Sequence, residues 1–172
     1  MATTGATRTP VATVRSGAVV DRPEPMRLDD ISKRLIDLLQ EDGRASYATL
    51  AKEVGLSEAG VRARVQRLLE SEVMQIVAVT DPTQVGFSRQ AMIGIRSVGD
   101  VRAVGDDVAA LDEVDYVVTT AGSFDLLAEV VCEDDPHLLE VVGAIRAIEG
   151  VLTTETFVYL KLNKQHYNWG TR

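Results

Sequence analysis

The chain has 172 residues, of which 45% are hydrophobic and 26% are charged, and its formal net charge is −8. This composition is typical of a globular protein, and the length is sufficient for two small domains that each have a core. No apolar run approaches the roughly 20 residues needed to cross a membrane, and the N-terminus lacks the apolar core of a secretory signal. The single cysteine, Cys132, excludes an internal disulfide framework, so we expect a cytoplasmic protein.

Residues 1–27 show no helical or alternating pattern, and we expect them to be a disordered leader. Two helices are predicted to follow. Asp29 or Asp30 caps the first, Ser46 caps the second, and Gly55 closes the second in a left-handed conformation. Their apolar faces are formed by Ile31, Leu35, Leu38 and Leu39 in the first helix and by Tyr47, Leu50, Ala51 and Val54 in the second.

A third helix is predicted from Leu56 to Leu69, with Ser57 as its N-cap. Apolar residues recur at helical spacing on its inner face, namely Val61, Val65, Leu68 and Leu69. The outer face presents Ala59, Gly60 and Ala63, then Arg62, Gln66 and Arg67, with Arg64 at its edge. Small residues let a helix approach another surface closely, and arginines suit phosphates and guanine edges. The candidate DNA contacts are therefore Ser57, Arg62, Arg64, Gln66 and Arg67, and the alternative is a solvated, arginine-rich helix face.

Two short helices joined by a glycine-containing turn, the second bearing arginines, are typical of a helix-turn-helix. We expect this DNA-binding domain to span residues 28–75, followed by a connecting strand and linker at 76–89. The β-prone run VMQIVAVTDP after Glu72 predicts this strand, as a wing or a connection. Residues 28–75 contain seven basic and nine acidic groups, so DNA binding would rely on local arginine patches and depend strongly on salt.

Residues 90–162 predict an α+β domain with the order β-α-β-β-α-β, a ferredoxin-like arrangement with both helices on one face of the sheet. Its strands are expected at 90–98, 114–121, 124–132 and 151–162. Its helices are expected from Val101 to Leu111 and from Asp135, as N-cap, to Gly150. Residues 163–172 form a C-terminal tail. The open face of the sheet is expected to bear apolar residues such as Met92, Tyr116, Phe157 or Tyr159, which favours pairing with a second copy.

The stretch from Leu28 to Phe87 resembles the DNA-binding half of the Lrp/AsnC (feast/famine) transcription regulators. The shared marks are the opening Leu-Asp, the DGR before the second helix, the LA…VGLS turn, the RV…RL of the third helix and the DP…G exit. Where the family usually has a glycine before its apolar strand, this sequence has Glu72 and Val73. Two later segments resemble parts of the family's C-terminal module, namely TTAGSFDLLAEV and GVLTTETFVYL. The resemblance therefore extends from residue 28 to about residue 162.

The resemblance implies a winged helix-turn-helix regulator that binds double-stranded DNA and assembles into homodimers and then octamers. It also implies an effector, commonly an amino acid, bound between dimers. The candidate effector residues are Gly122, Ser123, Phe124, Asp125, Thr154, Glu155 and Thr156. Gly122 would allow main-chain N–H groups to meet a carboxylate, and Asp125 or Glu155 could pair with an α-ammonium. From the residues alone, a hairpin turn in which Asp125 caps its own backbone is the alternative.

Cys132 and His137 are candidates for an enzymatic or metal site, because they lie five residues apart with three acids between them. No second Cys/His pair supplies zinc spacing, so we expect a core cysteine and a surface histidine, with no metal site. No phosphate loop, nucleophile elbow or dinucleotide fingerprint occurs, and we expect neither an enzyme nor a cofactor. The competing hypothesis is an oligomeric small-molecule-binding module whose helix-turn-helix makes protein contacts instead of binding DNA.

Overall fold

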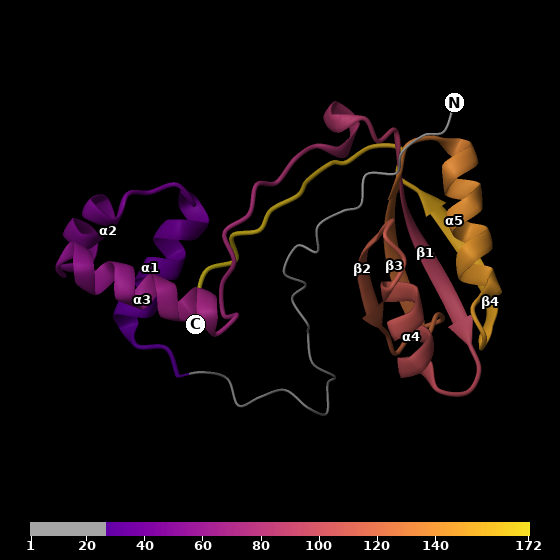
Figure 1. The fold of residues 1–172 in the computed structure, drawn as a ribbon, viewed down its shortest axis with the longest axis horizontal. Helices are drawn as coiled ribbons and strands as arrows, with labels where there is room; N and C mark the ends of the chain where they lie inside the picture. The colour runs from indigo at the N-terminus through magenta and orange to yellow at the C-terminus, as the bar shows by residue number, and fades with distance from the viewer. Residues whose placement is uncertain (1–26) are drawn as a thin grey trace. The chain divides into compact units, whose positions relative to one another are not determined.

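The computed structural model describes residues 27–172, and the predicted leader lies almost wholly outside the described residues. The chain divides into two compact units, which are drawn in Figure 1 and described separately below. Residues 27–78 and Lys164–Arg172 form the helix-turn-helix unit, and Val79–Asn163 form the sheet unit.

Local capping residues determine where the helices of the helix-turn-helix unit begin. The unit contains α1 (Asp30–Glu41), α2 (Tyr47–Val54) and α3 (Glu58–Glu70). Asp29, Ser46 and Ser57 cap them, and each side chain accepts a hydrogen bond from a first-turn backbone N–H. Gly55 ends α2 in the left-handed conformation at φ 68°. These caps confirm the predicted helix starts.

The core of this unit comes from the apolar faces predicted by helical spacing. Its buried members are Leu35, Leu39, Leu50, Ala51, Val61 and Val65. Leu69, predicted on the inner face of α3, is only half-buried but packs against this cluster. Burial of these side chains orients α3 so that its opposite face stays exposed.

The segment after α3 differs from the prediction. Residues 71–88 contain one 3₁₀ helix, η1 (Pro82–Val85), and no strand, so the predicted wing or connecting strand is wrong for the single chain. A strand needs a neighbour for its backbone hydrogen bonds, and no strand of residues 27–172 pairs with this segment. Its valines and isoleucine stay substantially exposed, as at Val77 (57%) and Val79 (61%).

Glu72, at the exit of α3, has φ 56° and is the one non-glycine residue with a positive φ among residues 27–172. Its backbone N–H donates to the Leu69 carbonyl, which helps to end the helix. This is the place where the resembled family usually has a glycine, and the left-handed conformation explains that preference.

The sheet unit has the predicted element order. Its elements are β1 (Arg89–Ser97), α4 (Val101–Ala109), β2 (Val114–Thr119), β3 (Leu126–Cys132), α5 (Asp135–Ala147) and β4 (Val151–Val158). The strands form one antiparallel sheet in the order β2-β3-β1-β4 (Figure 1). Both helices pack on one face, since Val104 and Val108 of α4 and Ile145 of α5 share a buried cluster with Ile93 and Ile95 of β1.

Several predicted boundaries in this unit are wrong. β2 ends at Thr119 instead of residue 121, and β3 begins at Leu126 instead of residue 124. Asp134, not Asp135, caps α5, because its Oδ1 accepts the backbone N–H of His137 at 2.8 Å. The last strand ends at Val158 instead of residue 162, because β4 lies at the sheet edge and pairs only with β1. The ladder runs out where β1 begins, and its last bond is from Tyr159 N to Gln90 O.

Candidate DNA-binding surface and ligand-binding loop

The exposed face of α3 is the candidate DNA-binding surface. Ala59 and Ala63 lie on it in the first two turns, and Arg62, Gln66 and Arg67 are exposed beside them. Ser57 is exposed at the N-terminus of α3, where its Oγ accepts the Gly60 N–H at 3.1 Å. The same face also includes Glu58 and Glu70, two acids that would meet any phosphate near the helix ends unfavourably.

The polar side chains of this face differ in their hydrogen-bond and ion-pair partners within the protein. Arg62 lies 3.5 Å from Glu58, one turn earlier, and stacks over the ring of Tyr47 at 4.8 Å from its centroid. Gln66 Nε2 donates to Glu70 Oε1 at 2.9 Å. Arg67 is exposed, and within residues 27–172 its guanidinium has no hydrogen-bond or ion-pair partner. Arg67 is therefore the cation most available to an incoming phosphate or base edge.

Arg64 is placed differently from the other DNA candidates. Its Nη1 lies 2.6 Å from Asp29 Oδ2 and 3.2 Å from Ser32 Oγ, and its side chain is 28% exposed. Hydrogen bonds from Ser32, together with Arg64, lower the pKa of Asp29 from 3.8 to about 2. In the described conformation Arg64 thus ties α3 to the start of α1. Sequence reasoning missed these partners because they lie 35 and 32 residues away.

The open face of the sheet gathers the apolar residues predicted for it. Register places Met92 opposite both Phe157 and Glu129, and Tyr116 opposite Glu129, so these side chains share the face turned away from the helices. Tyr116 and Phe157 are 52% and 44% exposed. Tyr159 joins them next to Glu129, where desolvation and then the Glu129 carboxylate raise the pKa of the tyrosine to about 12.

The candidate ligand-binding loop, residues 120–125, is fastened to β1. The backbone N–H of Asp125 donates to the Ile95 carbonyl, and Asp125 Oδ2 accepts the Ser97 N–H at 2.7 Å. Thr120 Oγ1 donates to the Phe124 carbonyl. The carboxylate of Asp125 therefore accepts a hydrogen bond from backbone, as the hairpin-turn alternative predicts. The backbone, however, belongs to the neighbouring strand β1 and not to the turn itself.

Phe124 covers a position on β1 that only glycine leaves open. A Cβ on Gly94 would lie 2.8 Å from three atoms of the Phe124 ring. Phe157 meets this ring edge-on at 6.1 Å between centroids, and the Arg96 guanidinium lies 5.9 Å from its centroid. Gly94 and Arg96 were missed in the sequence, because only the sheet register shows that they neighbour the loop.

Strand alternation separates the candidate effector residues on β4. Glu155 pairs with Gly94 and so lies on the open face near Phe124. Thr154 and Thr156 pair with Ile95 and Ile93 and face the helix side, where Thr154 Oγ1 accepts a hydrogen bond from Arg146 Nε at 2.7 Å. The structure brings Glu155 together with the loop and leaves the two threonines on the opposite face. Gly122 and Ser123 are exposed at the loop tip.

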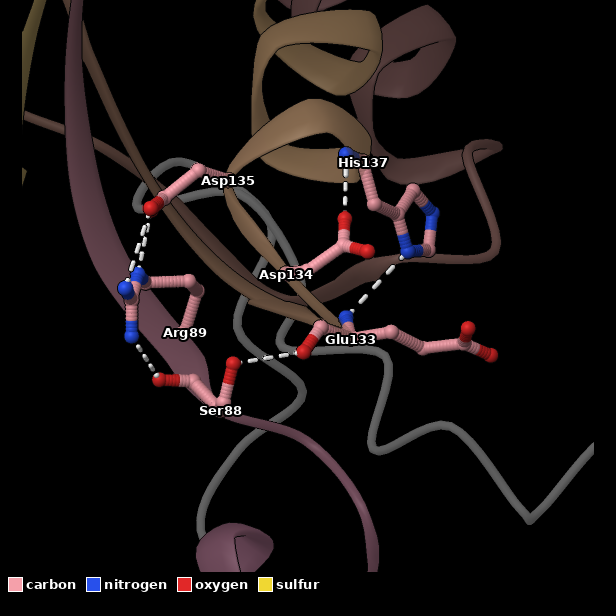
Figure 2. Close-up of polar contacts among 6 residues, drawn as sticks. All are labelled: Ser88, Arg89, Glu133, Asp134, Asp135 and His137. Atoms are coloured by element: carbon pink, nitrogen blue, oxygen red, sulfur yellow. Dashed lines mark hydrogen bonds and ion pairs between the residues drawn. The ribbon is translucent and has the colours of Figure 1, made fainter.

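Figure 2 shows the polar contacts where β1, β3 and α5 meet. Arg89 makes a forked ion pair with Asp135 at the start of α5, with Nη2 3.0 Å from Oδ2, and its Nη1 donates to the Ser88 carbonyl. Ser88 Oγ donates to the Glu133 carbonyl at 2.6 Å. The pair lowers the pKa of Asp135. These contacts hold the start of β1 against the end of β3 and the start of α5.

His137 and Cys132 have structural environments. His137 Nδ1 accepts the Glu133 N–H at 3.2 Å (Figure 2). Its Nε2 lies 3.3 Å from Glu113 Oε1. The predicted surface histidine is thus half-buried. Cys132 is fully buried, as predicted, and desolvation raises the pKa of its thiol to about 11. Among residues 27–172, no three His, Cys, Asp or Glu side chains are grouped so as to hold a metal ion.

No helix within residues 27–172 is long and apolar enough to cross a membrane. Comparison with family models gives two matches along the chain. Residues 28–69 match the AsnC-type helix-turn-helix domain, and residues 90–169 match the Lrp/AsnC ligand binding domain. The first match covers α1 to α3, and the second covers the sheet, the loop and part of the tail.

Individual relatives agree with these models. An uncharacterized HTH-type transcriptional regulator of Pyrococcus abyssi is 32% identical over 83% of this chain and 92% of its own length. The leucine response regulatory protein LrpA of Mycobacterium tuberculosis superposes with a TM-score of 0.73 at 27% identity, covering 80% of this chain and 96% of that one. The transcriptional regulator NMB0573 of Neisseria meningitidis, solved as an L-Met complex, has the same fold, with a TM-score of 0.72 at 24% identity over 83% and 96% of the two chains. The chain belongs to the Lrp/AsnC family of DNA-binding transcriptional regulators, which combine a helix-turn-helix with a ligand-binding domain.

Proposed function

We propose that this protein binds specific DNA sites through the exposed face of α3 and that a small effector, an amino acid, modulates this binding. The observation that carries the DNA half is the exposed face itself. Ala59 and Ala63 leave room for close approach, and beside them lies the Arg67 guanidinium, which has no partner among residues 27–172. A helix of this kind fits the major groove, where arginine can donate to guanine or to phosphate.

Among the candidate DNA contacts, Arg67 is expected to contribute most, because within the described part of the chain it has no partner to give up. Arg62 and Gln66 would exchange Glu58 and Glu70 for DNA, and Ser57 would add its hydroxyl at the helix start. Arg64 reaches DNA only by leaving Asp29, so in this proposal it chiefly positions α3.

The effector half rests on the loop of residues 120–125 and its neighbours on the open face. Gly122 and Ser123 present exposed backbone, while Glu155 and the second oxygen of Asp125 supply negative charge for an ammonium group. Arg96 supplies a cation for a carboxylate. The L-Met bound to the Neisseria regulator supports an amino acid as the ligand class. Thr154 and Thr156 would join such a site only from another protomer.

A second copy of the chain completes this proposal. The open face exposes Tyr116 and Phe157, and a homodimer that covers it would present two α3 helices to two half-sites. We also propose that these dimers assemble into octamers and that the protein is cytoplasmic.

Fluorescence anisotropy of the protein with its own upstream DNA tests both halves. We expect salt-sensitive binding that exceeds binding to a scrambled fragment of equal length, and a shift with one of the twenty amino acids. Absence of DNA binding at low salt would contradict the DNA half and favour the oligomeric ligand-binding module. Binding that none of the amino acids shifts would contradict the effector class while leaving the DNA half standing.

A further inference from the structure

The C-terminal tail belongs to a different unit from the strand that precedes it. β4 and the residues up to Asn163 are part of the sheet unit, whereas Lys164–Arg172 are part of the helix-turn-helix unit. The chain therefore connects the two units twice, once through residues 71–88 and once through the few residues after β4.

Two hydrogen bonds fasten the tail to α1. The backbone N–H of Gly170 donates to Gln40 Oε1 at 3.1 Å, and Thr171 Oγ1 donates to Asp37 Oδ1 at 3.1 Å. Gly170 turns the chain at φ 72°, a conformation that favours glycine. Residues 161–170 are all exposed, whereas Thr171 is half-buried, so the tail makes its contact at the end.

The face of α1 that receives the tail is suited to it. Ile36 lies one turn before Gln40 on the same side of the helix, and it is only 6% exposed although it is outside the core cluster around Leu35. The charges are also complementary. The second half of α1 and its exit have three acids and no base between residues 35 and 43, while residues 161–172 have three bases and no acid.

We propose that Lys164–Arg172 is an intramolecular clasp that restrains the helix-turn-helix unit relative to the sheet unit. Residues 71–88 contain no strand and only one short 3₁₀ helix, so by themselves they restrain the unit weakly. A second, fastened connection narrows the range of positions open to each α3. The functional consequence is that the clasp sets which spacings between two DNA half-sites a dimer can bind. This consequence rests on the proposed DNA binding.

Disulfide trapping in the full-length chain tests the contact without DNA. In the double variant Asp37→Cys/Thr171→Cys, the new thiols replace side chains whose oxygens lie 3.1 Å apart. Cys132 is fully buried, and its raised pKa keeps it a thiol, so the engineered pair reacts without interference. We expect rapid intrachain oxidation. The matched control is Arg34→Cys/Thr171→Cys, which should oxidise at least about tenfold more slowly, because Arg34 points toward Glu53 of α2, with its guanidinium 3.9 Å from that carboxylate.

DNA fragments with two half-sites at different spacings test the consequence. We expect the wild-type protein and the oxidised trap to prefer one spacing over a fragment changed by half a helical turn, about 5 base pairs. In Asp37→Ala/Gln40→Ala this preference should fall at least about fivefold. Without the clasp, the helix-turn-helix unit can bind half-sites at both spacings. Asp30→Ala, an exposed position at the other end of the same helix and outside the acidic stretch, should keep the wild-type preference.

The outcomes separate the clasp from the proposed function. If the trap oxidises no faster than its control, the clasp does not exist, whatever the protein does with DNA. If the trap forms but Asp37→Ala/Gln40→Ala keeps the full spacing preference, the tail is bound without restraining the unit and the proposal is overturned. If every form fails to bind DNA while the trap forms, the proposed DNA binding fails and the tail contact stands, and its predicted effect on spacing is withdrawn.

Discussion

Two arginines on α3, three residues apart, occupy opposite environments. Arg67 is exposed and unpaired among the described residues, whereas Arg64 is held by Asp29 and Ser32. Under the proposed function, Arg67 contacts DNA and Arg64 positions α3. Both residues fit the same sequence pattern, an arginine on an amphipathic helix. Only the tertiary contacts of Arg64 with α1 distinguish them.

Arg67→Ala should weaken binding to the specific DNA site by roughly 1–3 kcal/mol, because it removes one base or phosphate contact. It should leave the thermal midpoint unchanged, since Arg67 has no partner within residues 27–172 to lose. Anisotropy titration and a thermal melt measure the two effects. Arg64→Ala is the comparison and should lower the midpoint. Unchanged DNA affinity in Arg67→Ala would remove this residue from the interface.

The cap of α1 predicts a dependence of stability on pH. The pKa of Asp29 is lowered to about 2 from 3.8, so the stabilisation from its ionised form is complete above about pH 4 and is lost as the pH falls towards 2. Thermal melts followed by circular dichroism should show this loss in the wild type. Asp29→Asn should already be less stable at neutral pH and should lack this part of the acid-induced loss. Asp30→Asn, one residue along, is the control. An identical acid response in Asp29→Asn would contradict the assignment.

Glu72 tests the left-handed exit of α3. A non-glycine residue at φ 56° is strained by roughly 1–2 kcal/mol, and a β-branched residue is strained more. Glu72→Gly should therefore keep or raise the free energy of unfolding, while Glu72→Val should lower it by at least about 1 kcal/mol. Urea denaturation gives both values. Equal stability of the two variants would show that the exit does not depend on this conformation.

At this scale, prediction from sequence succeeded where the interaction is local. Ser46 and Ser57 were identified as caps, and Asp29 was one of two candidates for the first cap, because each bonds a backbone N–H within three residues. Asp135 was preferred to Asp134 because two adjacent aspartates before a proline give the same pattern. The partner of Arg64 lies 35 residues away, and no spacing rule could supply it.

At the scale of elements, the sheet register decides which candidate effector residues meet. Alternation along β4 was predictable, but which face each residue takes depends on pairing with β1. Glu155 and Phe124 therefore come together over Gly94, and Thr154 turns toward α5. The linker was predicted as a strand from its composition alone, although a strand also requires a partner.

Gly94→Ala should detach Phe124 from β1, because the new Cβ would lie 2.8 Å from three ring atoms. We expect a loss of about 1–3 kcal/mol in the free energy of unfolding of the sheet unit, measured by denaturant titration. Gly122→Ala is the matched control, since its Cβ would meet nothing within 4 Å and should leave stability unchanged. A weaker effector response in Gly122→Ala, without a stability change, would place the ligand at the loop tip. Wild-type stability of Gly94→Ala would show that the ring moves aside without cost.

At the scale of the whole molecule, the net charge of −8 opposes DNA, and the local arginines must overcome it. If Arg62 and Arg67 of both protomers in a dimer neutralise phosphates, the logarithm of the binding constant should fall with the logarithm of salt at a slope of about −4. Anisotropy at four or more salt concentrations measures it. Arg67→Ala should make the slope shallower by about 2 for the dimer. A slope near zero would exclude phosphate neutralisation as the source of affinity.

The tail also gives the helix-turn-helix unit an optical label. Trp169 is the only tryptophan of the chain, it lies within Lys164–Arg172, and it is 81% exposed. Indole emission therefore reports on one unit alone, while the far-ultraviolet signal sums the helices and strands of both. Because the ring is already mostly exposed, a blue shift of this emission on adding DNA or effector would mean that the ring has become covered, and the change could be assigned to the helix-turn-helix unit directly.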